Sequence, residues 1–77
     1  MEVTFDMDEA RVTVDAEYDS RWEEWTIEVV EVDLFDDEGN FVQRLDGAEQ
    51  CAEFQMQHAS LIEALTEKTI KERYAGE

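Results

Sequence analysis

The spacing of apolar residues changes once along this chain, and this change limits the folds open to it. The stretches VTFDM from Val3, VTVDAEY from Val12 and WTIEV from Trp25 alternate apolar with polar residues. A period of two residues is typical of half-buried β-strands. After Gly47 neither proline nor glycine occurs until Gly76, and apolar residues recur at helical spacing. The pattern predicts one domain, with strands in residues 1–46 and helix in residues 47–75.

The strand half contains three irregularities. The phase of the alternation changes within residues 8–11, which either a turn or a bulge explains. It slips again at Val29–Val30, which predicts a bulge, with Val30 opening the next set of inward apolar residues. In the stretch DDEGN, Gly39 suits the left-handed position of a hairpin connection. Residues 41–45 are then expected to return as a short strand.

The helical half has a start signal and an apolar face. Asp46 and Glu49 have the spacing of a capping box, with Asp46 as the N-cap. At 100° per residue one face gathers Cys51, Phe54, His58, Leu61, Ile62, Leu65 and Thr69. We therefore expect an α+β fold: an antiparallel sheet of three or four strands (a β-meander) with one long C-terminal helix packed on one face.

The expected elements differ in length. A helix over residues 47–74 would be about 42 Å long at 1.5 Å per residue, whereas strands of six to eight residues reach only about 20–26 Å. Part of the apolar stripe, Ile62 included, should then stay partly bare. Either the helix breaks, or a second copy of the chain covers the overhang. We expect a homodimer, with an interface formed by Leu61, Leu65, Ile70 and Tyr74.

Acidic residues dominate the charge. The chain has 22 Asp and Glu against 6 Lys and Arg, a net charge of −16, and 16 of these acids fall in residues 1–46. Such a chain repels nucleic-acid phosphates and anionic membranes, so a basic protein is the expected partner. Mutual repulsion of the acids also predicts stability that rises with salt.

Catalytic and metal-binding motifs fail on spacing. Cys51 and His58 share a helix face but lie about 10.5 Å apart along the axis, too far for a nucleophile and its base or for one zinc ion. Counted back from Gly39, the first ligand position of a calcium loop would be Leu34, which cannot ligate. We expect no enzyme activity, no cofactor and no built metal site, with Cys51 as a small core residue.

The cellular setting is inferred from two features. A lone cysteine cannot form a disulfide within the chain, which favours a reducing compartment. Residues 1–10 lack the basic and apolar regions of a signal peptide, and no apolar run approaches about 18 residues. We expect a cytoplasmic protein that does not bind membranes.

The candidate binding residues lie around the two tryptophans. Trp25 fits the inward phase and is expected in the core, whereas Trp22 lies in a polar connection and either contacts a partner or caps the core. Acids alternate along the outer faces of the flanking strands. The expected contact set is Asp15, Glu17, Asp19, Trp22, Glu23, Glu24 and Glu28.

Two alternatives compete with this binding surface. In one, the acids only form a solvated face and the chain is a small structural homodimer. In the other, the chain responds to cations through its acidic loop. The acids of that loop are Asp36, Asp37 and Glu38.

The stretches VTVDAEYD and WTIEVVEVDLFDDEGNFV, followed by an acid-rich helix, resemble small acidic bacteriophage-encoded accessory proteins. The resemblance covers most of the chain. It implies a host-defence inhibitor, acting in the host-cell cytoplasm, that imitates nucleic-acid charge and occupies the basic groove of a restriction or CRISPR complex. It transfers no functional residue.

Overall fold

A four-stranded antiparallel sheet and two helices make up the α+β fold. The computed structural model describes the backbone of residues 1–75 and the side chains of residues 1–73. In chain order the elements are β1 (Glu2–Met7), β2 (Ala10–Asp19), β3 (Glu24–Phe35), β4 (Phe41–Leu45), α1 (Ala48–Gln57) and α2 (Ala59–Ala75). The strands lie side by side in the same order, each antiparallel to the next, as in a meander. The expected antiparallel sheet is confirmed, with four strands.

The expectation of one long helix is wrong, because the helical segment breaks at His58. The backbone of His58 has φ −124° and ψ 25°, outside the helical region. Its N–H still donates to the carbonyl of Phe54 at 3.1 Å, and Ile62 donates to the carbonyl of His58 at 2.9 Å. The break lets α1 pack on β3 while α2 packs on β1. The break is one of the two solutions expected for the length mismatch, and the homodimer stays a prediction.

The expected cap at Asp46 is also wrong. The N-cap of α1 is Gly47, which is extended at φ −76° and ψ 141° and supplies no side-chain cap. Its carbonyl accepts the first helical hydrogen bond, from the N–H of Cys51 at 2.9 Å. The helix thus begins one residue later than the capping-box spacing predicts.

The core lies between the sheet and the helices. Its buried residues are Val3, Phe5, Ala10, Val12, Val14, Ala16, Val29, Val32, Cys51, Ile62 and Ile70. Ile62 and Ile70 are 1% and 5% exposed, so the expectation that this part of the helical stripe would stay partly bare is wrong for these two residues. Leu61, at 47% exposed, points away from the sheet.

The irregularities of the strands are resolved. The phase change at residues 8–11 is a turn, since Met7 pairs with Ala10 and Glu9 takes the left-handed conformation at φ 59°. The bulge at Val29–Val30 is confirmed, because Val14 pairs with Val29 while Thr13 pairs with Glu31. Val30 is the extra residue and is 39% exposed, so it does not join the inward set as expected.

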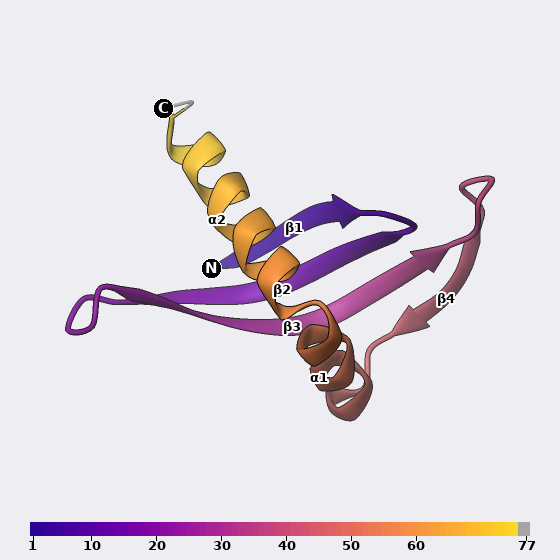
Figure 1. The fold of residues 1–77 in the computed structure, drawn as a ribbon, viewed down its shortest axis with the longest axis horizontal. Coiled ribbons are helices and arrows are strands. Elements are labelled where there is room, and N and C mark those ends of the chain that lie inside the picture. The colour runs from indigo at the N-terminus through magenta and orange to yellow at the C-terminus, as the bar shows by residue number, and fades with distance from the viewer. Residues whose placement is uncertain (76–77) are drawn as a thin grey trace.

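The helices cross one face of the sheet diagonally (Figure 1). They cover its middle and leave two regions of that face open. At one end the hairpin of β2 and β3 projects past both helices and past β1, and at the other the sheet extends toward the β1–β2 turn and β4 (Figure 1). Within the part of the chain that is described, neither helix is long and apolar enough to cross a membrane.

Candidate binding surface: the acidic hairpin

The strand register brings the predicted acids together on the projecting hairpin. Residues 15–28, here called the acidic hairpin, contain six acids and one base, Arg21. Asp15 pairs directly with Glu28, and Asp19 pairs with Glu24. Since paired residues point to the same side of a sheet, these carboxylates share the face turned away from the helices, as does Glu17. Five of the seven predicted contact residues therefore lie on one surface.

Few cations offset this surface. The α-ammonium of Met1 lies 3.3 Å from Asp15 Oδ1, and the guanidinium of Arg21 lies 3.4 Å from Asp19 Oδ2. Both contacts are solvent-exposed, where an ion pair contributes about 0–1 kcal/mol at most. The row that crosses the sheet at Asp15 also contains Glu2 of β1, opposite Asp15 on its other side. Sequence reasoning missed Glu2 because the register was needed to place it.

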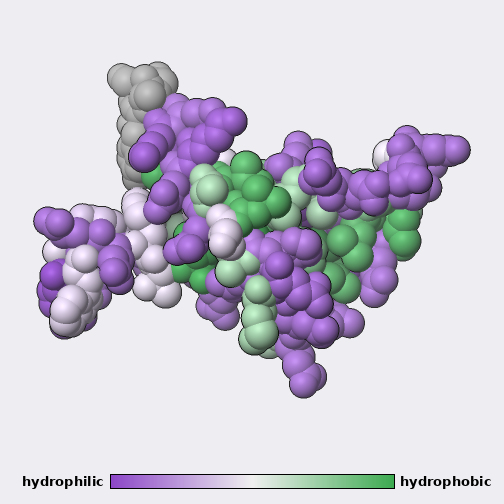
Figure 2. All heavy atoms as spheres, in the orientation of Figure 1, coloured by the Kyte–Doolittle hydropathy of each residue, from purple (hydrophilic) through white to green (hydrophobic). Residues whose placement is uncertain are grey.

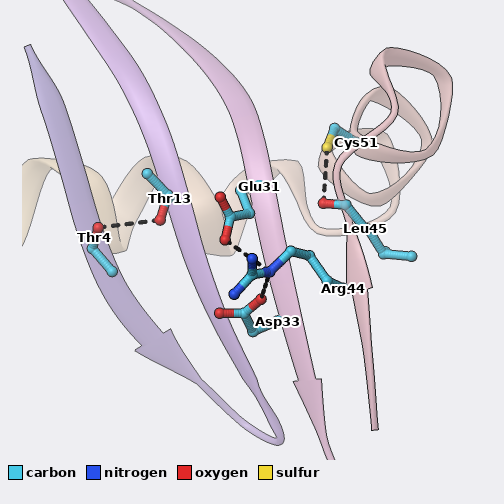
Figure 3. A network of polar contacts seen from close by, with 7 residues as sticks. All are labelled: Thr4, Thr13, Glu31, Asp33, Arg44, Leu45 and Cys51. Carbon is cyan, nitrogen blue, oxygen red and sulfur yellow. Dashed lines mark hydrogen bonds and ion pairs between the residues drawn. The ribbon is translucent and has the colours of Figure 1, made fainter. Parts of the chain in front are cut away.

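At the other end of the same face, two arginines pair with three acids. Arg44 Nε contacts Asp33 Oδ1 at 2.8 Å and Glu31 Oε1 at 3.1 Å (Figure 3). The pKa of Arg44 is raised by its hydrogen bond to Asp33. Attraction to Asp33 and Glu31 adds to this effect. Arg11 Nε contacts Asp6 Oδ1 at 3.0 Å. On this outer face, the acids exceed their ion-pair partners most at the hairpin end.

The tip of the hairpin presents Trp22 to solvent. Asp19 anchors the tip by accepting the N–H of Arg21 at Oδ1, at 2.9 Å, and the N–H of Trp22 at its carbonyl, at 3.3 Å. Glu23 closes the loop in the left-handed conformation at φ 52°. Trp22 is 71% exposed, so it does not cap the core. Of the two roles considered for Trp22, capping the core is wrong, and partner contact stays a prediction.

Two acids of α2 lie beside the inner face of the hairpin, which the sequence did not predict. Trp25 is half-buried and packs beside Tyr18, with 5.3 Å between the ring centroids. A hollow of about 260 Å³ next to Trp25 is lined in part by Glu63 and Glu67 of α2. In the sequence, these glutamates are four residues apart, a spacing that indicates only a solvent-exposed face of the helix. The crossing angle of α2 turns them toward the hairpin.

Cys51 and His58 contact different partners. Cys51 is buried, and its Sγ donates to the carbonyl of Leu45 at 3.5 Å (Figure 3), which confirms its place in the core. Burial raises the pKa of the Cys51 thiol, further from the value a nucleophile needs. His58 packs on the ring of Phe54 at 4.6 Å between centroids.

The residues expected at a dimer interface have different surroundings. Leu61 is exposed and Leu65 is half-buried. Ile70 is buried within the chain and has little surface to offer a second copy. The side chain of Tyr74 lies outside the described residues.

The acidic β3–β4 loop is organised by its own backbone. Asp36 Oδ1 accepts the N–H groups of Asn40 at 2.8 Å and Glu38 at 2.9 Å, and these bonds lower the pKa of Asp36. Gly39 has φ 87°, the left-handed conformation expected of it. Among the described residues no three His, Cys, Asp or Glu side chains are grouped so as to hold a metal ion.

Comparisons with known proteins assign no role to the acidic hairpin. No family model, no curated protein and no solved structure matches this chain.

Proposed function

We propose that this chain is a non-enzymatic binding protein whose acidic hairpin engages a basic protein partner. The observation that carries the proposal is the concentration of carboxylates on the outer face of one projecting element, with two glutamates of α2 beside its inner face. The outer face holds Asp15, Glu17, Asp19, Glu24 and Glu28, while Glu63 and Glu67 border the inner one. Trp22 at the tip adds a large exposed aromatic side chain, a residue type enriched in binding hot spots.

Folding alone gives no reason for this arrangement. Like charges placed directly opposite each other on neighbouring strands destabilise a sheet. Asp15 and Glu28 are placed in this way. A cationic partner would relieve that repulsion on binding. It would also be drawn to the hairpin, because a surface of one sign accelerates encounter with the opposite sign.

The test uses a fluorescent peptide of alternating lysine and glycine, followed by anisotropy at low and high salt. The double variant Glu24→Lys/Glu28→Lys should weaken its binding by about tenfold or more. The matched control is Glu53→Lys/Glu72→Lys, which makes the same change in net charge at exposed helical positions. Equal losses in the two variants would show that net charge, rather than the hairpin, attracts the peptide.

In its sharpest form, the partner is a nucleic-acid-handling host complex and the chain occupies its basic groove, as an inhibitor encoded by a phage would. Support comes from charge of the same sign at a spacing of the same order. Alternate side chains of a strand stand about 6.6–6.8 Å apart, and DNA carries one charge per about 3.4 Å along each strand. A host protein captured on the immobilised chain should be released by duplex DNA and by salt. Capture that duplex DNA leaves untouched would contradict charge mimicry while leaving the basic partner in place.

A further inference from the structure

A second open surface lies at the opposite end of the helix-bearing face. Here an apolar groove of about 360 Å³ opens between α1, the β1–β2 turn and β4. Its apolar lining is formed by Met7, Ala10, Leu34, Phe35, Val42 and Phe54. Figure 2 shows apolar side chains exposed on this side of the molecule, bordered by hydrophilic ones. We call this surface the Phe54 groove.

The groove is shaped by the diagonal crossing of the helices. Phe54 and His58 border it from the end of α1, and their rings pack on each other. Val42 borders it from β4 and is 60% exposed, although it is a valine in a strand. Leu34 pairs with Gln43 and Phe35 with Phe41, which leaves Val42 as the extra residue of a second bulge.

The rim of the groove is acidic. Asp8 and Glu9 line it, and an adjoining hollow of about 410 Å³ that shares Glu9 also includes Asp36 and Asp37. A hydrogen bond to Asp37, together with repulsion from it, raises the pKa of Glu9. Arg11 also lines that hollow, but its ion pair is with Asp6, so acids still outnumber bases around the rim.

The combination of apolar lining and acidic rim selects the occupant. A second copy packed symmetrically on this groove would bring two acidic rims into one interface, in chains that each carry a net charge of −16. A segment with apolar side chains and flanking Lys or Arg satisfies both the lining and the rim. Ligand sites usually have volumes of about 300–1,000 Å³, and the groove lies near the lower end of this range. Its volume therefore suits a few side chains.

We propose that the Phe54 groove binds an amphipathic helical segment of a partner protein, with apolar residues in the groove and Lys or Arg against the acidic rim. This mode resembles the docking of other amphipathic helices in apolar grooves. The groove lies on the opposite face and at the opposite end of the sheet from the outer acids of the hairpin. It therefore forms a separate contact and does not depend on the function proposed for the hairpin.

The test uses a short fluorescein-labelled peptide with leucine and lysine at helical spacing. Anisotropy gives its affinity, and amide chemical shifts locate it on the chain. The variant Val42→Asp should weaken binding by about tenfold, which is 1.4 kcal/mol. Its matched control is Val30→Asp, because Val30 is also an exposed valine at a bulge but does not line the groove. The control should bind the peptide as tightly as the unmodified chain does. The amide chemical shifts that change on binding should be those of the groove residues.

The other outcomes overturn the proposal, each in a distinct way. A glycine–lysine peptide that binds as tightly as the leucine–lysine peptide would show that apolar contacts contribute nothing. Loss of binding in Glu24→Lys/Glu28→Lys but not in Val42→Asp would place the peptide on the hairpin and support only the function proposed above. In the absence of peptide, the amide chemical shifts of the groove residues could change with chain concentration. If they did so, and if the change vanished in Val42→Asp, the occupant would be a second copy of the chain.

Discussion

Asp15 on β2 and Glu28 on β3 are direct cross-strand partners on the exposed outer face of the acidic hairpin. Glu2 of β1 extends the same row on the other side of Asp15. Neighbouring strands lie about 4.7–4.9 Å apart, so three carboxylates stand in a line at this spacing. Repulsion along this line opposes folding, and it is the clearest local cost of the hairpin's charge.

Replacing Glu28 with lysine should stabilise the chain. Glu28→Lys converts the repulsive pair with Asp15 into an attractive one, with an expected gain of about 0.2–1 kcal/mol. Thermal unfolding at low salt measures this gain as a higher Tm. The advantage should shrink at high salt, because screening weakens exposed charge interactions.

The control for this variant lies on the same face. Glu17→Lys changes the net charge equally, but Glu17 faces Thr26, an uncharged partner. It should therefore stabilise the chain less than Glu28→Lys. Equal gains would show that the effect comes from the overall charge of −16 rather than from the cross-strand row.

Replacing Thr66 with valine should also stabilise the chain. Thr66 is fully buried on the inner face of α2, and its Oγ1 has no hydrogen-bond partner among the described residues. An unsatisfied buried polar group costs about 1–3 kcal/mol, and valine has nearly the same shape, so Thr66→Val should gain about 1 kcal/mol in urea unfolding. Thr69→Val is the matched control, since Thr69 Oγ1 donates to the carbonyl of Leu65 at 2.8 Å. Stabilisation by the control alone would contradict the placement of Thr66.

Features of local origin could be predicted from the sequence. The bulge at Val30 follows from a slip in apolar alternation, and the left-handed conformation of Gly39 follows from its place in a hairpin connection. The acids of the hairpin were predicted on outer strand faces for the same reason. Their exact partners were not, because the register depends on the hairpin tip and on the bulge together.

Features that depend on packing could not be predicted. No glycine or proline marks the break at His58, which instead lets α1 and α2 follow different strands. The crossing angle that results turns Glu63 and Glu67 toward Trp25. It also leaves the Phe54 groove uncovered. A helical projection assigns residues to the faces of one helix. It gives no information on the angle at which two helices pack on a sheet.

Removal of the Glu9 carboxylate should change how stability depends on pH. The pKa of Glu9 is raised above its ordinary value of 4.5, first by the hydrogen bond to Asp37 and then by repulsion from it. The folded chain therefore favours protonated Glu9, and its stability falls as pH rises through the raised pKa. Glu9→Gln should be more stable than the unmodified chain at pH 7, and the difference should narrow below the ordinary pKa.

Urea unfolding at neutral and acidic pH measures this difference. The control Glu38→Gln removes a charge from the nearby β3–β4 loop but keeps the carboxyl of Glu9, which is hydrogen-bonded to Asp37. The stability difference between this control and the unmodified chain should depend less on pH. A difference between Glu9→Gln and the unmodified chain that stays constant with pH would contradict the raised pKa.

The orientation of α2 can be tested with two adjacent residues. Ile62 is 1% exposed in the core, whereas Leu61 is 47% exposed. Ile62→Ala should cost about 2–5 kcal/mol, a large part of the stability of a small domain, because it leaves a cavity between α2 and the sheet. Leu61→Ala should change stability by about 0.5 kcal/mol or less, as exposed substitutions usually do. Urea unfolding of both variants measures the contrast, and similar losses would mean that α2 is rotated about its axis or that Leu61 is buried against a second copy of the chain.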